Sequence, residues 1–448
     1  MNSKLILAAV ALSLIAVAVA IALFPPPLLP GSHDVLSAAQ RIHIPGAVGP
    51  ESLVFDPTGG GPYTGVADGR ILRYTAGDWI EFSLTSSSRD ACSLPFNPAM
   101  EHICGRPLGL RFHQKTGDLY IADAYLGLHV VGPAGGLATP VVTHVEGQRL
   151  RFTNDLDIDD ENDVIYFTDS SAEYYRREFM SSVLNSDATG KFMKYDMSSK
   201  EVTVLLRGLA FANGVALSKD RSFVLVAETA RCRVLRLWLH GPNAGKQDVF
   251  AEVPGYPDNI RRNSEGEFWV ALHSKHGLVA RLSTSYSWFG RGLWKLPLSF
   301  KQLHYLFVGG KPHATAIKLS DTGEVLRVLE DAEGKTLKFI SEVEERDGKL
   351  WIASAKAMTT KLILSTAFLA LLISISLLYF DSEYPSILHQ QYSNNNATIK
   401  FQDAVGLESF DFDGGGGGPY TGVSDGRIIR WQANESRWVD FAVTSPDR

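Results

Sequence analysis

The chain has 448 residues, of which 45% are hydrophobic and 21% charged, and its formal net charge is −6. These proportions exclude a disordered or fibrous chain and fit a globular protein. The mild acidity gives no electrostatic reason to expect nucleic acid as a partner. Three cysteines are too few for a disulfide-dense scaffold, although Cys92 and Cys104 are close enough in sequence to pair in an oxidising compartment.

The N-terminal residues 1–24 contain an uncharged hydrophobic run at 5–24, behind Lys4. The run is long enough to span a bilayer, and Ala18-Val19-Ala20 within it resembles a signal-peptide cleavage site. Both a cleaved signal and a retained signal anchor remain open. In either case we expect entry into the secretory pathway.

The beginning of the chain recurs from Met358. The stretch 358–380 carries a second hydrophobic run at 362–380, and residues 418–431 match residues 61–74 at eleven of fourteen positions. We interpret this as a tandem restart whose second copy, 381–448, stops early. It indicates either a gene model that joins two neighbouring proteins or a chain that contacts the membrane through both runs. The two N-x-S/T sequons, Asn396 and Asn434, follow the second run.

Between 51 and 355 the pattern is short apolar alternation broken by Gly, Asn and Asp turns, which is typical of an all-β protein. A strand–turn–strand unit recurs six times, which predicts a six-bladed β-propeller over residues 40–355 with an incomplete last blade. We expect residues 275–310 to form loops at the channel mouth and only 173–186 to hold a short helix. The six units are 51–69, 108–124, 154–171, 213–228, 258–274 and 341–355.

The residues that open these units should face the central channel at one height, because equivalent positions in successive blades are related by the propeller axis. Four of them offer carboxylate or amide oxygens, which are ligands that calcium prefers. Asn and Asp also make turns before strands, so each alone has a structural explanation. The opening residues are Glu51, Leu108, Asn154, Asn213, Asp258 and Ser341.

Several motifs of the chain resemble plant strictosidine synthase-like proteins. They are GPESLVFD, GPYTGVADGRI, Cys92 with Cys104-Gly-Arg, the strand at 166–169 and FVLVAE at 223–228. The resemblance covers about residues 40–355 and implies a six-bladed propeller, a luminal or vacuolar setting and a Cys92–Cys104 disulfide. The second copy matches only the N-terminal part of the family.

The resemblance also bears on the reaction. Strictosidine synthase joins an amine to an aldehyde by a Pictet–Spengler condensation with one essential Glu, and Ser341 stands where that Glu falls. Glu342 is adjacent, but neighbouring side chains in a strand point to opposite faces. Paraoxonases and gluconolactonases, which belong to the wider superfamily, hold a calcium with a set similar to Glu51, Asn154, Asn213 and Asp258, and Asn259 fits the paraoxonase pattern.

We therefore predict a calcium-assisted hydrolase of ester- or lactone-type small molecules. Asp258 or a nearby histidine, His129 or His273, would orient or deprotonate the attacking water, and Ser341 is a weaker candidate nucleophile. Pictet–Spengler condensation and a non-catalytic binding propeller are the alternatives.

Overall fold

The computed structural model describes residues 28–92, 97–295, 298–309 and 312–354, and three short strands between 420 and 443. The chain divides into two compact units, Met1–Ser376 and Leu377–Arg448. The predicted membrane segments 5–24 and 362–380 and the sequons Asn396 and Asn434 lie outside the described residues. In the described part, every helix is too short or too polar to cross a membrane.

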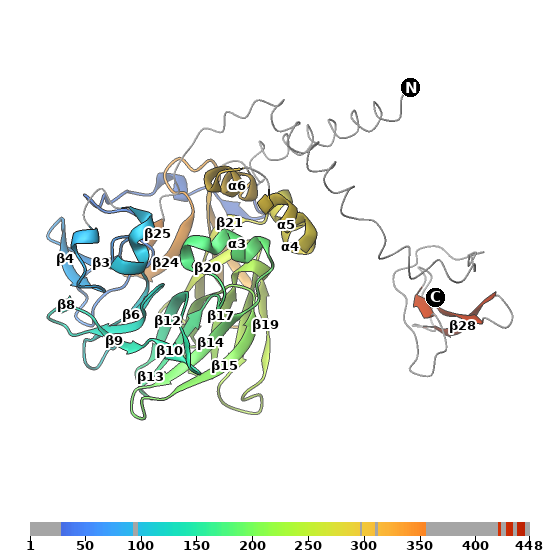
Figure 1. Cartoon of the computed structure of the whole chain (residues 1–448), viewed down its shortest axis with the longest axis horizontal. Helices are drawn as coiled ribbons and strands as arrows, with labels where there is room; N and C mark the ends of the chain where they lie inside the picture. The colour runs from blue at the N-terminus through green and yellow to red at the C-terminus, as the bar shows by residue number, and fades with distance from the viewer. Residues whose placement is uncertain are drawn as a thin grey trace, which may run out of the picture. The chain divides into compact units, whose positions relative to one another are not determined.

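The described part of the first unit contains six successive sheets, and each of the six sequence units opens one of them (Figure 1). Their innermost strands β5, β12, β16, β20 and β24 contact one another in that order, and β5 also contacts β2. This confirms the six-bladed propeller. The first blade consists of β2 (Tyr63–Gly65), β3 (Arg70–Thr75), β4 (Asp78–Leu84) and β8 (Gly136–Leu137), and the second of β5 (Pro107–Phe112), β6 (Leu119–Asp123), β7 (Gly127–Val131) and β9 (Thr139–Val142). The third consists of β12 (Thr153–Asp159), β13 (Val164–Asp169), β14 (Gly190–Asp196) and β15 (Val202–Leu209), and the fourth of β16 (Ala212–Leu217), β17 (Phe223–Glu228), β18 (Arg233–Trp238) and β19 (Gln247–Glu252). The fifth consists of β20 (Gly255–Arg262), β21 (Phe268–Lys275), β22 (Ala314–Leu319) and β23 (Val325–Asp331), with β1 (Ser32–His33) added, and the sixth of β24 (Ile340–Arg346) and β25 (Lys349–Ser354).

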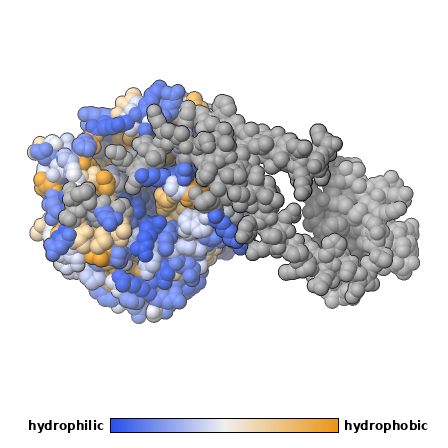
Figure 2. All heavy atoms as spheres, turned by 45° about the horizontal axis from the view of Figure 1, so that its top comes forward, coloured by the Kyte–Doolittle hydropathy of each residue, from blue (hydrophilic) through white to orange (hydrophobic). Residues whose placement is uncertain are grey.

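Burial explains why these segments form strands with so little polar alternation. In β16 and β17 every residue is buried, because the neighbouring blades cover both faces of the sheet. Apolar clusters fill the spaces between blades, so hydrophobic burial holds the ring together. On the face of the molecule shown in Figure 2, hydrophobic side chains form separate patches among hydrophilic ones.

The ring closes between the first and last blades. The backbone N–H of Leu53 donates a 2.8 Å hydrogen bond to Oε1 of Glu342, and Ser341 Oγ donates one of 2.6 Å to the Glu51 carbonyl. Strand β1 pairs in parallel with β23, so Ser32 and His33 attach to the fifth blade.

Helices cover one end of the propeller. The expectation of loops at 275–310 is wrong, since this stretch forms three amphipathic helices, α4 (Leu278–Ser285), α5 (Ser287–Lys295) and α6 (Phe300–Phe307). The interruptions at Gly277, Tyr286 and Pro297 hid their helical periodicity. Figure 1 shows them together beside α3, which falls in the expected helical stretch 173–186. The remaining short elements are α2 (Glu101–Cys104), α3 (Phe179–Leu184), the 3-10 turns η1 (Leu36–Ala38), η2 (Asp90–Cys92), η3 (Pro98–Met100), η4 (Arg176–Glu178) and η5 (Thr229–Arg231), and the hairpin β10 (His144–Val145) with β11 (Gln148–Arg149).

The described residues of the second unit form a three-stranded antiparallel sheet of β26 (Tyr420–Gly422), β27 (Arg427–Gln432) and β28 (Arg437–Val443). Tyr420 pairs with Arg430 as Tyr63 pairs with Arg73, so β26 and β27 repeat the register of β2 and β3. The sequence repeat is therefore also a repeat of strand pairing.

Candidate functional site

The inner strands of five blades share a β-bulge near the predicted site residues. In β5 the pairing register shifts between Pro107 and Gly109. The corresponding shifts in β12, β16, β20 and β24 lie within residues 153–156, 212–215, 257–260 and 340–342. A bulge redirects side chains out of strict alternation and is frequent beside active sites. It lets each inner strand turn its opening residue toward the axis.

Two glycines allow these strands to approach closely. A Cβ on Gly214 would lie 2.5 Å from the carbonyl oxygen of Asp258, and one on Gly109 would lie 2.7 Å from Cα of Asp155. Only glycine fits such backbone contacts. The glycine after Asn213 thus brings β16 against β20 and sets the distance between two site residues.

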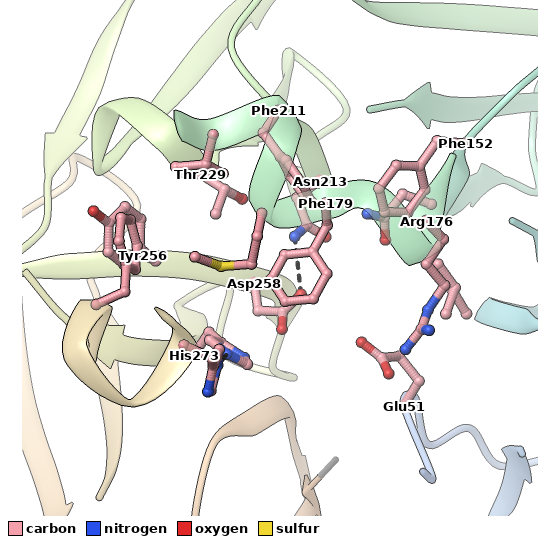
Figure 3. Close-up of a pocket in the computed structure, with 16 residues that line it drawn as sticks. Glu51, Phe152, Arg176, Phe179, Phe211, Asn213, Thr229, Tyr256, Asp258 and His273 are labelled. Atoms are coloured by element: carbon pink, nitrogen blue, oxygen red, sulfur yellow. Dashed lines mark hydrogen bonds between the residues drawn. The ribbon is translucent and has the colours of Figure 1, made fainter. Parts of the chain in front are cut away.

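Five of the six opening residues line one cavity of about 120 Å³. The sixth, Ser341, lies beside it. Figure 3 shows Asn213 and Asp258 reaching the cavity from the strands β16 and β20, and Glu51 from the irregular segment before β2. The other walls are mainly apolar and come from inner strands and from α3 and α6. They include Phe152, Phe179, Met180, Val183, Phe211, Tyr256 and Phe307.

Asn213 and Asp258 form the central polar pair. Nδ2 of Asn213 donates a 2.9 Å hydrogen bond to Oδ1 of Asp258. Oδ1 of Asn213 is buried and has no hydrogen-bond partner among the described residues. Burial, and next the nearby charge of Glu51, raise the pKa of Asp258 well above its ordinary value, although the Asn213 bond opposes this. The pair therefore presents an unsatisfied oxygen beside a buried carboxyl group that forms no ion pair with any described residue.

Glu51 and Asn154 supply the remaining polar atoms of this cluster. One carboxylate oxygen of Glu51 accepts a 2.9 Å bond from the buried guanidinium of Arg106, which also donates to the Gly49 carbonyl. Nδ2 of Asn154 donates to Ser170 Oγ at 2.8 Å, which leaves the amide oxygen for other contacts. In both residues the protein fixes one end of the group and leaves an oxygen available.

A pair of histidines lies at another wall of the cavity. Nε2 of His273, in β21, and Nε2 of His304, in α6, are 3.1 Å apart, so one ring donates a proton to the other. Burial lowers the pKa of His273 to about 3 and that of His304 to about 4. Burial thus keeps both rings neutral, so an unprotonated ring nitrogen of the pair can accept a hydrogen bond but is a weak base.

Comparisons with known proteins show the family of the chain. A family profile described as strictosidine synthase matches residues 154–242, and one described as strictosidine synthase-like, N-terminal, matches residues 33–74. Protein strictosidine synthase-like 10 of Arabidopsis thaliana is 66% identical over 334 residues, which is 74% of this chain and 89% of the relative. The chain belongs to the strictosidine synthase-like family.

Protein strictosidine synthase-like 3 of the same plant is 51% identical over 312 residues, which is 68% of this chain and 80% of that protein. Among solved structures, a putative gluconolactonase has a TM-score of 0.46 at 14% identity, covering 70% of this chain and 88% of that one. A calcium-binding regucalcin from Agrobacterium tumefaciens has a TM-score of 0.43 at 14% identity, covering 67% and 79%.

The position expected for the catalytic glutamate of strictosidine synthase is occupied differently in this member of the family. Ser341 is fully buried and its hydroxyl is bonded to the Glu51 carbonyl, so it is not placed as a nucleophile in the cavity. Glu342 forms an ion pair with Arg261 and does not line the cavity. Arg261 also holds Asp155 through bonds of 2.6 and 2.9 Å. One buried cation is thus shared by two carboxylates outside the cavity lining.

Two further predicted site residues lie away from the cavity lining. Asn259 donates to Oε2 of Glu342 at 3.1 Å, because successive side chains of β20 diverge after Asp258. His129 is buried in β7, with Nδ1 against the Gly127 carbonyl, and burial lowers its pKa. Its position is that of a structural histidine. The described residues contain no group of three His, Cys, Asp or Glu side chains arranged to hold a metal.

The predicted Cys92–Cys104 disulfide is present, and Cys232 is free and buried. His304, Arg176 and the aromatic walls from α3 and α6 were not predicted from the sequence. The available signal was the capping box at Ser299 and Gln302, which marks the start of α6.

Proposed function

We propose that this strictosidine synthase-like protein is a calcium-assisted hydrolase of small, largely apolar esters or lactones. The observation that carries the proposal is the buried amide oxygen of Asn213, left without a partner beside the Asp258 carboxylate. A buried acceptor of this kind is costly unless something binds it. A cation satisfies it and also neutralises the Asp258 carboxylate, whereas Glu51 already pairs with Arg106.

The donor set fits calcium. Glu51, Asn154, Asn213 and Asp258 offer only carboxylate and amide oxygens, and calcium takes such ligands in open, irregular coordination. When bound, calcium polarises a substrate carbonyl and stabilises the negative charge that develops on its oxygen.

The chain's own residues would handle the proton. The His273–His304 pair, kept neutral by burial, accepts a hydrogen bond from the attacking water. Asp258 orients or deprotonates that water. The aromatic and aliphatic walls exclude bulk solvent and favour an apolar acyl or leaving group.

The test is turnover of aryl esters and lactones with calcium or with a chelator. We expect activity to require calcium and Asp258→Asn to lower kcat/KM by roughly 10²–10⁴-fold. Asp248→Asn, an isosteric change at the exposed Asp248–Arg236 pair of the fourth blade, is the matched control and should retain activity. Calcium-independent turnover, or equal loss in both variants, would contradict the proposal.

The same assay separates the alternatives. Product from tryptamine and secologanin would favour Pictet–Spengler condensation, and tight ligand binding without turnover would favour a binding propeller. We also propose a luminal endomembrane or vacuolar setting. The hydrophobic run at 5–24 and the Cys92–Cys104 disulfide support it.

A further inference from the structure

The segment that contains the three helices α4, α5 and α6 has an unusual charge composition. Residues 268–320 include seven Lys or Arg and no Asp or Glu, although the whole chain has a net charge of −6. Lys275 and Lys318 pair with Glu330 and Glu267 of the protein itself, whereas the four cations of the helices are exposed. A helical segment that exposes cations and no acidic residue favours a negatively charged partner.

The same helices expose large aromatic side chains. Tyr286, Trp288, Trp294 and Phe300 are 52%, 56%, 40% and 45% exposed. Four exposed cations lie among them in the sequence. We call these eight residues the cap face: Arg281, Tyr286, Trp288, Arg291, Trp294, Lys295, Phe300 and Lys301.

The geometry of α5 gives the cap face its direction. Trp288, Arg291 and Lys295 follow one another at spacings of three and four residues, so they lie on one side of the helix. On the other side, Gly290 packs against the Leu184 carbonyl of α3, where a Cβ would be only 2.5 Å away. The inner side of α5 is therefore held against the protein, and its outer side presents aromatic and basic groups together.

The inner side of this helical cap is the roof of the cavity. His304 and Phe307 of α6 line it, and Phe307 stacks on Tyr256 with ring centroids 5.1 Å apart. Phe300 contacts Phe179 of the cavity wall edge-on at 5.4 Å. Of the three helices, α6 lines the cavity, and α4 and α5 lie beside it (Figure 1).

We propose that the cap face binds the headgroup region of an anionic lipid bilayer. Trp and Tyr are enriched at membrane–water interfaces, and amphipathic helices rich in Lys and Arg with bulky apolar residues lie in that interface. Each Lys or Arg near an anionic surface strengthens such binding about fivefold. The absence of any acidic residue in 268–320 fits a uniformly negative surface better than a protein partner of mixed charge.

Lipid contact at the cap face would place α6, which lines the cavity, next to the membrane surface. Substrates that partition into lipid would then reach the enzyme from the bilayer surface. The inference rests on the surface of α4, α5 and α6 and does not depend on the hydrolase chemistry.

The test uses the full chain reconstituted into two kinds of vesicle, pure phosphatidylcholine and phosphatidylcholine with roughly a third phosphatidylserine. Any insertion of the hydrophobic runs 5–24 and 362–380 is common to both, so the difference between the vesicles reports on the cap. Amide hydrogen exchange is read segment by segment. We expect the amides of α5 to exchange roughly tenfold more slowly on the anionic vesicles, with the difference reduced by high salt.

A charge-reversed triple variant, Arg291→Glu with Lys295→Glu and Lys301→Glu, should lose this protection. The control, Lys246→Glu with Arg262→Glu and Arg327→Glu, changes the net charge equally at exposed positions of the propeller blades and should keep it. Unchanged exchange in β16 shows that both variants remain folded.

Three results would overturn the proposal. Exchange of α5 that is equal on the two vesicle types would remove the lipid preference. Equal loss of protection in both triple variants would show that only net charge matters. Protection that depends on protein concentration, whatever the lipid, would assign the cap face to a protein contact.

Discussion

The amide of Asn213 is turned so that its nitrogen donates to Asp258 and its oxygen is left buried without a partner among the described residues. The two residues sit on adjacent inner strands, β16 and β20, whose approach depends on Gly214. A backbone feature of the propeller therefore sets the geometry of the proposed cation site, and its consequences can be measured.

The close approach at Gly214 predicts a stability effect. Gly214→Ala places a methyl group 2.5 Å from the Asp258 carbonyl and should lower the free energy of unfolding by about 1–3 kcal/mol. Gly132→Ala is the control, because the nearest atom to its Cβ is 3.8 Å away, and it should change stability by less than about 0.5 kcal/mol. Equal unfolding midpoints in denaturant for the two variants would refute the explanation.

The buried histidines predict a pH dependence. The unfolded chain protonates His304 near its ordinary pKa of 6.5, whereas the folded protein does so only at about 4. The unfolded state thus binds more protons in this window, and His304 lowers stability on acidification by about 1.4 kcal/mol per pH unit. Glu342 acts in the opposite sense, because burial raises its pKa to about 7 and its contribution is lost as the pH rises from 4.5.

The two effects overlap, so the test is a difference. His304→Gln should make the free energy of unfolding less dependent on pH between about 4 and 6.5 than in the unmodified chain. Identical pH profiles for the two proteins would show that His304 is not held neutral by the fold.

The sixth blade predicts a requirement for further strands. In the described residues it consists of β24 and β25 only, and a cavity of about 830 Å³ lies between β25 and residues 39–50. An uncovered strand edge is a liability. We expect the segment 25–357 to melt several degrees below a version extended by a family-type C-terminal strand pair. Equal melting temperatures and solubilities would count against this view of the sixth blade.

The tandem restart predicts a glycosylation pattern. If the run at 5–24 delivers the propeller to the lumen, the run at 362–380 acts as a stop-transfer segment and keeps Asn396 and Asn434 in the cytosol. The intact chain should then be unglycosylated, and a chain that starts at Met358 should be glycosylated. A glycosidase-sensitive mass shift of the intact chain would contradict this topology.

The number and positions of the blades could be predicted from the sequence, because each blade opens with a recognisable unit of alternating apolar residues and a polar turn. The sequence was also sufficient to place Asn154, Asn213 and Asp258 in one register, since the repeat relates them. The roles of their neighbours were harder to predict. The bulge between Ile340 and Glu342 breaks strict alternation, and the destination of Glu342 depends on Arg261 from another blade.

The roof of the site was missed for a different reason. The helices α4, α5 and α6 are eight or nine residues long, and each is too short for its periodicity to stand out against the turns between them. His304 approaches His273 only through the packing of α6 on the propeller, which local sequence does not encode.

The calcium content of the purified chain shows whether Asn213 and Asp258 hold a cation. We expect about one equivalent of calcium, a melting temperature that falls on chelation, and loss of both properties in Asn213→Leu, which removes the unpaired oxygen and the donor to Asp258. Asn185→Leu, in a side chain that bonds only to the local Ser181 carbonyl of α3, should retain calcium. A chain that contains no calcium and melts at the same temperature with and without chelator would contradict the account.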